Sequence, residues 1–353
     1  MPVGLKAENL QRTGSFKLRG AANAISKLSR ERLARGIVAA SAGNHAQAVA
    51  WAARHAQVRA TVCMPADCPL AKLEAVRALG AEVKLVPGSY EDSQDAARVL
   101  AESEDGALVH AFADPDVIAG QGTVGLEIAK DAPETRLIVV PMGGGGLVSG
   151  VAIAAKDRLE GVRVVAVQAA ERSGRTIADG IAVKEPAELN LQLVKEHVDD
   201  VVAVSDDEIA QAMVHLIERS KLVVEGAGAA AVAAVLCGRV QPPDGGSACI
   251  VLSGGNVDAS LLAECIRMGE TAAGRRAVLK TVLPDRPGAL DALLHVVADH
   301  GANIVDVAHL REGIDLHVRE TLIRLVVQTR GRDHALEITE AMRARGFDVD
   351  VEH

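Results

Sequence analysis

Aromatic residues are scarce in this sequence of 353 residues, which holds three Phe, one Trp and one Tyr. Aromatic rings are the platforms on which nucleic-acid bases stack, so their scarcity argues against a dedicated nucleic-acid-binding protein. The charge points the same way, because 38 Lys and Arg against 47 Asp and Glu give a net charge of −9, which disfavours contact with a phosphate backbone. Hydrophobic residues still make up 49% of the chain, which is ample material for a folded core.

The sequence also lacks paired cysteines and long apolar runs. Its five cysteines include no C-x-x-C pair, so we interpret them as small buried residues in a reducing compartment rather than as metal ligands or disulfides. The longest run of small apolar residues, from Gly226 to Gly238, is shorter than the roughly 20 residues that a membrane span needs. No signal-peptide pattern is visible. We therefore expect a cytoplasmic protein with no membrane partner.

Short apolar runs alternate with longer helical patterns from Gly36 to about Met268. Strands that are apolar throughout and separated by helices form parallel sheets covered on both faces, so the sequence predicts an α/β fold. The expected strands are Gly36–Ala40, Ala60–Met64, Glu82–Val86, Ala107–Phe112, Arg136–Pro141, Val162–Val167 and Ala248–Leu252. The expected helices include Asn44–His55, Leu70–Leu79, Ser89–Glu104 and Asp206–Ser220.

The pattern changes after Gly274, where strands and helices follow in the order β-α-β-β-α-β that is typical of a ferredoxin-like α+β domain. We place a domain boundary near Ala272–Ala277 and a hairpin at Asp315–Glu320. The expected elements are Val278–Leu283, Ala289–His300, Asn303–His309, Glu320–Thr329, Asp333–Arg345 and Phe347–Val351.

The segment Lys6–Ala21 contains Lys17 directly after Ser15 and Phe16. A lysine near a helix N-terminus in apolar surroundings can have a pKa low enough to form a Schiff base with a carbonyl compound. A lysine after Ser and Phe is usually an ordinary surface lysine. The length of the surrounding block Lys6–Ala21 favours a functional role for Lys17 instead.

The segment Ser41–Gln47 follows an expected strand and begins an expected helix. Free backbone N–H groups at such a helix start bind anions, including a carboxylate, and an Asn side chain can donate to a phenolate oxygen. The alternative is a structural N-cap. We expect the His45 side chain itself to be a packing residue.

Four glycines, Gly143–Gly146, lie between an expected strand and the expected helix Val148–Leu159. Their backbone N–H groups would be exposed to a phosphate. The segment matches neither the P-loop nor the G-x-G-x-x-G pattern, so it favours a small phosphorylated cofactor over a nucleotide. A flexible turn is the poorer alternative, because glycines lose much conformational freedom on folding.

Two further segments, taken alone, do not distinguish a structural from a functional role. Ser253–Asn256 follows a strand and would be a plain turn. Glu225–Ala229 holds small residues that suit close helix packing as well as they suit a function.

In this order the segments resemble the threonine ammonia-lyase (threonine dehydratase) family, pyridoxal-phosphate enzymes of fold type II with a two-lobed, tryptophan synthase β-like fold. The resemblance covers the whole chain, and residues 275–353 resemble an ACT domain, an amino-acid-sensing module. The matching pieces are Lys6–Ala21, Ser41–Gln47, Met64-Pro65 with Pro69 and Lys72, Gly143–Leu147, Ile177–Ala182, Glu225–Ala229, Ser253–Asn256, Asp285–Leu290 and Gly301–Ile304.

The resemblance implies roles for individual residues. Lys17 would bind pyridoxal 5'-phosphate covalently and act as the catalytic base, Asn44 would contact the ring hydroxyl oxygen, and Ser253 would face the ring nitrogen. The cofactor phosphate would be bound by Gly143, Gly144, Gly145, Gly146 and Leu147. The substrate carboxylate would be bound by Ser41, Ala42, Gly43, Asn44 and His45.

The implied reaction converts L-threonine to 2-oxobutanoate and ammonia, with L-serine giving pyruvate as a second activity. One alternative is a serine-preferring dehydratase on the same scaffold. The other is an inactive chain that binds an amino acid without turning it over.

Three departures from the family pattern accompany the resemblance. Ala42 stands where racemases of this fold have a second serine, so racemisation is disfavoured. Gln168 stands where they have a metal-binding Glu, so no metal is expected. Relatives also have a few tens of residues before the segment that matches Leu5–Glu8, so we expect this chain to lack that N-terminal segment.

We expect a catalytic domain over residues 1–272, with a smaller lobe over about 30–130, and an ACT-like regulatory domain over 275–353. The resemblance implies a homodimer or homotetramer and feedback by an amino acid such as isoleucine or valine, through an interface near Asn303–His309. A regulatory domain favours a role in isoleucine biosynthesis.

Overall fold

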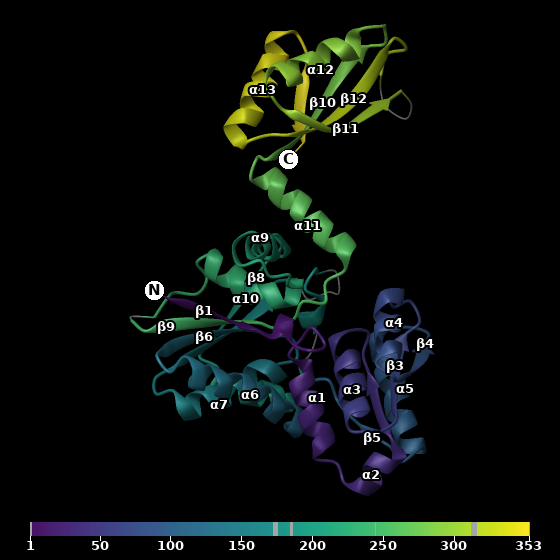
Figure 1. Ribbon diagram of the computed structural model, residues 1–353, viewed down its shortest axis with the longest axis vertical. Coiled ribbons are helices and arrows are strands. Elements are labelled where there is room, and N and C mark those ends of the chain that lie inside the picture. The colour runs from purple at the N-terminus through teal and green to yellow at the C-terminus, as the bar shows by residue number, and fades with distance from the viewer. Residues whose placement is uncertain (1, 172–175, 184–185, 244, 312–315, 353) are drawn as a thin grey trace. The chain divides into compact units, whose positions relative to one another are not determined.

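The computed structural model describes residues 2–171, 176–183, 186–243, 245–311 and 316–352. It divides into two compact units, Met1–Asp258 and Ala259–His353, which are described separately (Figure 1). Helix α11 (Ala259–Ala272) is assigned to the second unit. The expected end of a catalytic domain at residue 272 stays a prediction.

The first unit contains two sheets in which every neighbouring pair of strands is parallel, as the apolar runs predicted. The larger sheet has the strand order β1-β9-β6-β7-β8, and the smaller has the order β4-β3-β2-β5. The strands of the larger sheet are β1 (Val3–Ala7), β6 (Thr135–Pro141), β7 (Arg163–Ala169), β8 (Asp200–Val204) and β9 (Ser247–Leu252). Those of the smaller sheet are β2 (Ile37–Ala40), β3 (Ala60–Pro65), β4 (Glu82–Val86) and β5 (Ala107–Leu108).

Helices cover both faces of each sheet. One core cluster joins the smaller sheet to α1, α3 and α4, and a second joins it to α5. In the larger sheet, α6 and α7 share a core with β6, β7 and β9, while α10 lies on the opposite side (Figure 1). The helices are α1 (Lys17–Ser26), α2 (Arg30–Arg35), α3 (Asn44–His55), α4 (Leu70–Ala78), α5 (Tyr90–Ser103), α6 (Pro115–Asp131), α7 (Gly146–Arg158), α8 (Glu188–His197), α9 (Asp206–His215) and α10 (Gly226–Leu236). Short helical turns are Glu8–Leu10, Asp179–Ile181 and Leu216–Ser220.

The structure corrects two of the expected elements. The strand expected over Ala107–Phe112 ends at Leu108, because the carbonyl groups that follow it bind side chains of the site described below instead of a neighbouring strand. The helix expected over Asp206–Ser220 ends as an α-helix at His215 and continues as a π-helical turn.

The second unit contains an antiparallel sheet with the order β11-β12-β10-β13, the arrangement that its ferredoxin-like pattern predicted. One face of the sheet shares a core with both helices that follow α11. Of the hairpin expected at Asp315–Glu320, residue 315 lies outside the described residues. The elements are β10 (Arg276–Pro284), α12 (Ala289–Asp299), β11 (Asn303–Leu310), β12 (Glu320–Gln328), α13 (Arg332–Ala344) and β13 (Val349–Glu352).

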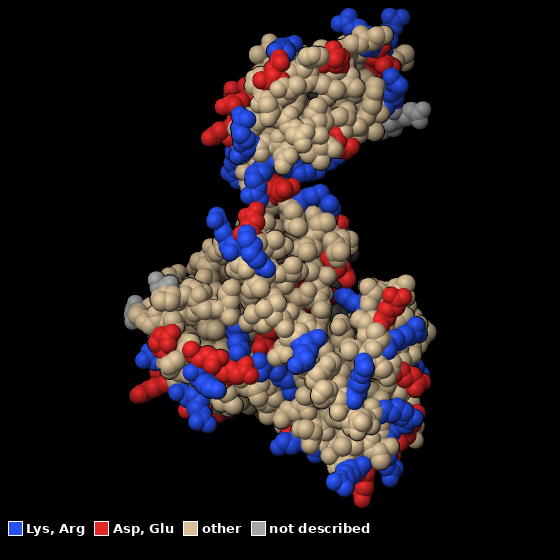
Figure 2. Space-filling view, in the orientation of Figure 1, with Lys and Arg blue, Asp and Glu red and all other residues tan. Residues whose placement is uncertain are grey.

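Charged side chains of both signs are interspersed over the face of each unit that Figure 2 shows. Many form exposed ion pairs, such as Arg98 with Asp95 at 2.6 Å. Exposed pairs of this kind contribute about 0–1 kcal/mol each, so the apolar cores carry most of the stability. Among the described residues, none of the helices has the length and apolar character required to span a membrane.

Candidate active site

Lys17 begins α1 at the carboxyl end of the larger sheet. The preceding residues are tied to the end of β9, because Ser15 forms a β-bridge with Gly254 and the Phe16 N–H donates to the Ser253 carbonyl at 3.0 Å. These contacts place Lys17 next to Ser253, although the two residues lie far apart in the sequence.

The Lys17 amine is buried and donates to the carbonyl of Ala111 at 2.8 Å. The rings of Phe16 and Phe112 lie 5.3 Å and 6.0 Å from its Nζ. Burial lowers the pKa of Lys17 from 10.5 to about 8, and the charge of Glu225 opposes that shift. A neutral amine is therefore accessible near physiological pH, as a nucleophile or general base requires. The interpretation as a surface lysine is wrong.

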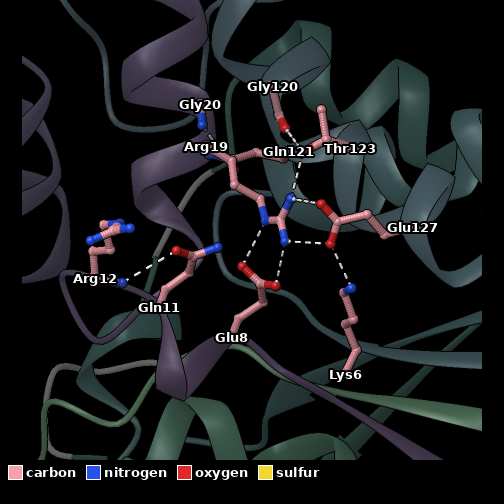
Figure 3. A network of polar contacts seen from close by, with 10 residues as sticks. All are labelled: Lys6, Glu8, Gln11, Arg12, Arg19, Gly20, Gly120, Gln121, Thr123 and Glu127. Atoms are coloured by element: carbon pink, nitrogen blue, oxygen red, sulfur yellow. Dashed lines mark hydrogen bonds and ion pairs between the residues drawn. The ribbon is translucent and has the colours of Figure 1, made fainter. Parts of the chain in front are cut away.

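Arg19 holds the start of α1 in place through a network of ion pairs (Figure 3). Its guanidinium donates to Glu8 at 2.7 and 2.8 Å and to Glu127 at 2.7 Å through each of two nitrogens. Lys6 donates to Glu127 at 2.6 Å. The hydrogen bond from Arg19 is the main reason why the pKa of Glu127 falls to about 2. The network joins β1, α1 and α6, which fixes the helix turn that carries Lys17.

The start of α3 offers free N–H groups at the end of β2. The Gly43 N–H donates to the hydroxyl of Ser41 at 3.1 Å, whereas those of Asn44, His45 and Ala46 have no acceptor within the part of the chain that the structure describes. Such a helix start suits a carboxylate.

The His45 side chain turns away from that helix start. Its Nε2 lies 2.9 Å from the carbonyl of Val109, which can only accept, so Nε2 carries the proton. Burial, and then the charge of Lys17, lower the pKa of His45 to about 3. His45 is therefore neutral and packs, as expected, so only its backbone N–H is placed to bind a ligand.

The side chain of Asn44 links three of the sequence motifs. It donates to Glu225 Oε1 at 2.7 Å, and its own oxygen accepts from Asn256 Nδ2 at 2.7 Å. Burial, and then the charge of Asp179, raise the pKa of Glu225 to about 7. Ser253, which directly follows β9, is also buried.

The glycine run forms a close-packed cradle rather than a loose turn. Among the described residues, its N–H groups have no backbone or side-chain acceptor, from Gly143 through Leu147. Gly145 has a φ of +85°, a conformation that side chains strain. A Cβ at Gly144 would lie 2.5 Å from the Phe112 ring. Several free N–H groups at the start of α7 are the arrangement that binds a phosphate.

Two contributors to the site were not predicted from the sequence. The buried amide of Asn190, from α8, donates to the carbonyls of Gly144 and Phe112 and so anchors the cradle. The segment after β5 supplies the carbonyls that hold His45 and Lys17. This segment follows a parallel strand directly, and ligands bind beyond the carboxyl ends of such strands, so its position in the sequence could have indicated a place in the site.

These residues fit pyridoxal phosphate, which combines an aldehyde, a ring and a phosphate. Lys17 offers a buried amine of lowered pKa, and the run Gly143–Leu147 offers unpaired N–H groups for the phosphate. Ser253 follows β9 of the larger sheet, and Asn44 follows β2 of the smaller sheet and is tied to the same turn through Asn256. Both can therefore meet polar atoms of the ring. In the described residues, we find no group of three His, Cys, Asp or Glu side chains that could hold a metal ion.

Comparison with known proteins agrees with this fit. Residues 1–254 match the model of the pyridoxal-phosphate dependent enzymes, and residues 277–344 match the model of the ACT domain. This chain belongs to the pyridoxal-phosphate dependent enzyme family. It carries a C-terminal ACT domain, and the fold class predicted from the sequence is confirmed.

Relatives within this family are similar over most of their length. The chain is 45% identical to an L-threonine ammonia-lyase of Thermotoga maritima over 99% of this chain and 90% of that protein. It resembles the processed form of threonine deaminase isoform 2 from Solanum lycopersicum with a TM-score of 0.71 and 33% identity, over 75% of this chain and 82% of that one. It also resembles a serine racemase from Dictyostelium discoideum with a TM-score of 0.68 and 38% identity. That match covers 72% of this chain and 88% of the racemase.

Proposed function

We propose that this protein is a pyridoxal-phosphate-dependent threonine ammonia-lyase, which converts L-threonine to 2-oxobutanoate and ammonia and L-serine to pyruvate. The observation that carries the proposal is the buried Lys17 amine, with its pKa near 8, next to the end of the strand that leads to Ser253. The T. maritima relative, which is similar over nearly the whole chain, supports the choice of threonine.

Different residues of this chain would bind different parts of the cofactor. When bound, the cofactor supplies an electron sink for the pair left at the substrate α-carbon. The N–H groups of Gly143–Leu147 would hold its phosphate, Asn44 would donate to its ring oxygen, and Ser253 would lie near its ring nitrogen. A neutral hydroxyl does not keep that nitrogen protonated as a carboxylate would, which favours elimination over transamination.

Lys17 would both hold the cofactor and move the proton. The free N–H groups at the start of α3 bind the substrate carboxylate and so orient the α-carbon. The neutral Nζ of Lys17 would accept the α-proton, and the β-hydroxyl would leave as water. The released enamine would then tautomerise and react with water to give 2-oxobutanoate and ammonia. Ala42 offers no second acid or base on the opposite face, which disfavours racemisation.

Absorption spectra test this proposal. We expect the purified chain with pyridoxal phosphate to show a visible band of the bound cofactor that Lys17→Ala lacks and that shifts when threonine is added. A band that shifts equally in Lys17→Ala would contradict the role of Lys17. A stable band with no product would favour the non-catalytic alternative.

The preference for threonine rests on the pocket that receives the substrate methyl group. One methyl group in a pocket discriminates by about 1–3 kcal/mol. We expect a higher kcat/KM for threonine than for serine, and the reverse order would establish the serine-preferring dehydratase.

The ACT domain supports regulation and self-association. Strand β11 lies at the edge of its sheet, and Val305, Val307 and Leu310 on it are exposed, which suits pairing with a second copy. We propose a homodimer or homotetramer whose rate responds to isoleucine or valine, consistent with isoleucine biosynthesis. Light scattering and initial rates with each amino acid test both parts. A monomer that responds to neither would refute them.

We place this activity in the cytoplasm. The support is chemical, because Cys63, Cys68, Cys237 and Cys249 are free thiols, and Cys63 and Cys249 are buried.

A further inference from the structure

A chain of three side chains fixes the orientation of the Asn44 amide. The Nδ2 of Asn256 donates to the backbone carbonyl of Thr13 at 2.8 Å. Because a backbone carbonyl can only accept, the nitrogen end of the Asn256 amide must face it. The second N–H of the same nitrogen therefore meets the oxygen of Asn44 at 2.7 Å, which turns the amino group of Asn44 toward Glu225.

Glu225 completes this chain from a position that is itself tightly held. It precedes α10 as the N-cap residue and is buried. Its backbone N–H donates to the carbonyl of Gly254 at 3.1 Å, which ties the start of α10 to the turn after β9. A Cβ on Gly254 would lie 2.3 Å from Glu225 Oε1, so the glycine provides the room for the carboxylate.

An amide nitrogen has two N–H groups, and Glu225 accepts one of those on Asn44. The other is left to donate elsewhere in the site that holds Lys17. We propose that Glu225 is a positioning residue that, by accepting one N–H of Asn44, directs the second toward the ring oxygen of the cofactor. This inference rests on the proposed function, because it assigns Asn44 to that oxygen.

Charged groups face Glu225 from several elements. Asp179 comes from the turn before α8, Lys72 from α4 and Lys17 from α1. Lys72 also lies 3.3 Å from Asp179 and 3.7 Å from Asp258. An ionised Glu225 is a stronger acceptor than a neutral one, so it holds Asn44 more firmly. Asp179 carries a similar charge nearby, which makes it a suitable control.

A double-mutant cycle on the holoenzyme tests the proposal. Cofactor affinity is measured by titrating the visible band in the wild type, Glu225→Gln, Asn44→Ala and the double variant. Gln keeps the size of Glu but replaces one acceptor oxygen with a donor. We expect Glu225→Gln to weaken cofactor affinity about tenfold, equivalent to about 1.4 kcal/mol, and to shift the band maximum toward that of Asn44→Ala.

The coupling between the two sites decides the outcome. In the Asn44→Ala background, we expect Glu225→Gln to change affinity by less than about twofold. The same tenfold loss in both backgrounds would overturn the proposal, and so would an equal loss in Asp179→Asn, which would indicate a general charge effect. Denaturation of each apoprotein verifies that the Gln variant folds.

The proposal and the function on which it rests fail differently. Absence of a Lys17-dependent band in the wild type would refute the proposed function. A normal wild-type band with unchanged affinity in Glu225→Gln would refute only the role of Glu225.

Discussion

The burial of Lys17 predicts that its charge destabilises the apoprotein. The fall of its pKa from 10.5 to about 8 corresponds to about 3 kcal/mol of unfavourable free energy for the charged form, since one pKa unit equals about 1.4 kcal/mol. A buried ammonium that meets a backbone carbonyl and two aromatic rings has poor compensation for its lost water.

The sign of the pH dependence follows from proton binding. Between the folded and unfolded pKa values, the unfolded chain holds more protons at this site, so stability rises with pH. The penalty is complete below the folded pKa and disappears as pH rises toward the unfolded value. Relative to Lys17→Met, the wild-type apoprotein should gain about 2 kcal/mol between about pH 7.5 and about pH 10.

Urea denaturation of both apoproteins measures this difference. The sequence has one tryptophan, Trp51 in α3, which stacks on His55 in the unit that contains Lys17, so its fluorescence reports on that unit. Lys27→Met removes an exposed lysine after the same helix and supplies the reference curve. If the difference between wild type and Lys17→Met stays constant over this pH range, the argument from burial is refuted.

Three further substitutions have expected outcomes. Arg19→Met leaves the buried Glu8 carboxylate without its partner, so the free energy of unfolding should fall by about 3–5 kcal/mol. The control Arg98→Met, at an exposed ion pair, should lower it by about 0–1 kcal/mol. Equal losses in the two variants would contradict the importance of the Arg19 network. Gly145→Ala forces a side chain into a left-handed conformation at about 1–2 kcal/mol, so titration should show roughly tenfold weaker cofactor binding, and unchanged binding would argue against the cradle. Lys72→Met removes ion pairs to the exposed carboxylates of Asp179 and Asp258, so denaturation should show a loss of only about 0–1 kcal/mol. A loss as large as that of Arg19→Met would contradict this reasoning.

The sequence predicted those parts of the fold that depend on local patterns. Helix α3 has the expected bounds Asn44–His55. Helix α5 begins at Tyr90, one residue after the expected start at Ser89, which is its N-cap and forms a capping box with Asp92. Apolar runs predicted the parallel strands, because strands buried on both faces need apolar residues at every position. The end of β5 was missed, since it depends on which partner its carbonyl groups find.

The site was predictable where backbone chemistry requires particular residues. The glycines at Gly143–Gly146 and the lysine of the Lys6–Ala21 block are recognisable as motifs. Asn190 and Ala111 were not, because one acts through a single amide from a distant helix and the other through a carbonyl that any residue has. Glu225 stayed undecided because its importance comes from Asn44, which lies on another helix.

The central claim is that this chain removes water from threonine, with Lys17 as the base, to yield 2-oxobutanoate and ammonia. The most direct measurement is product formation from L-threonine by the purified protein with pyridoxal phosphate, beside Lys17→Ala. We predict 2-oxobutanoate and ammonia in equal amounts from the wild type and at least about a thousandfold slower release from Lys17→Ala, since loss of a general base and of the covalent link each removes a large factor. Equal rates in the two proteins, or no product from a wild type that holds its cofactor, would contradict the account.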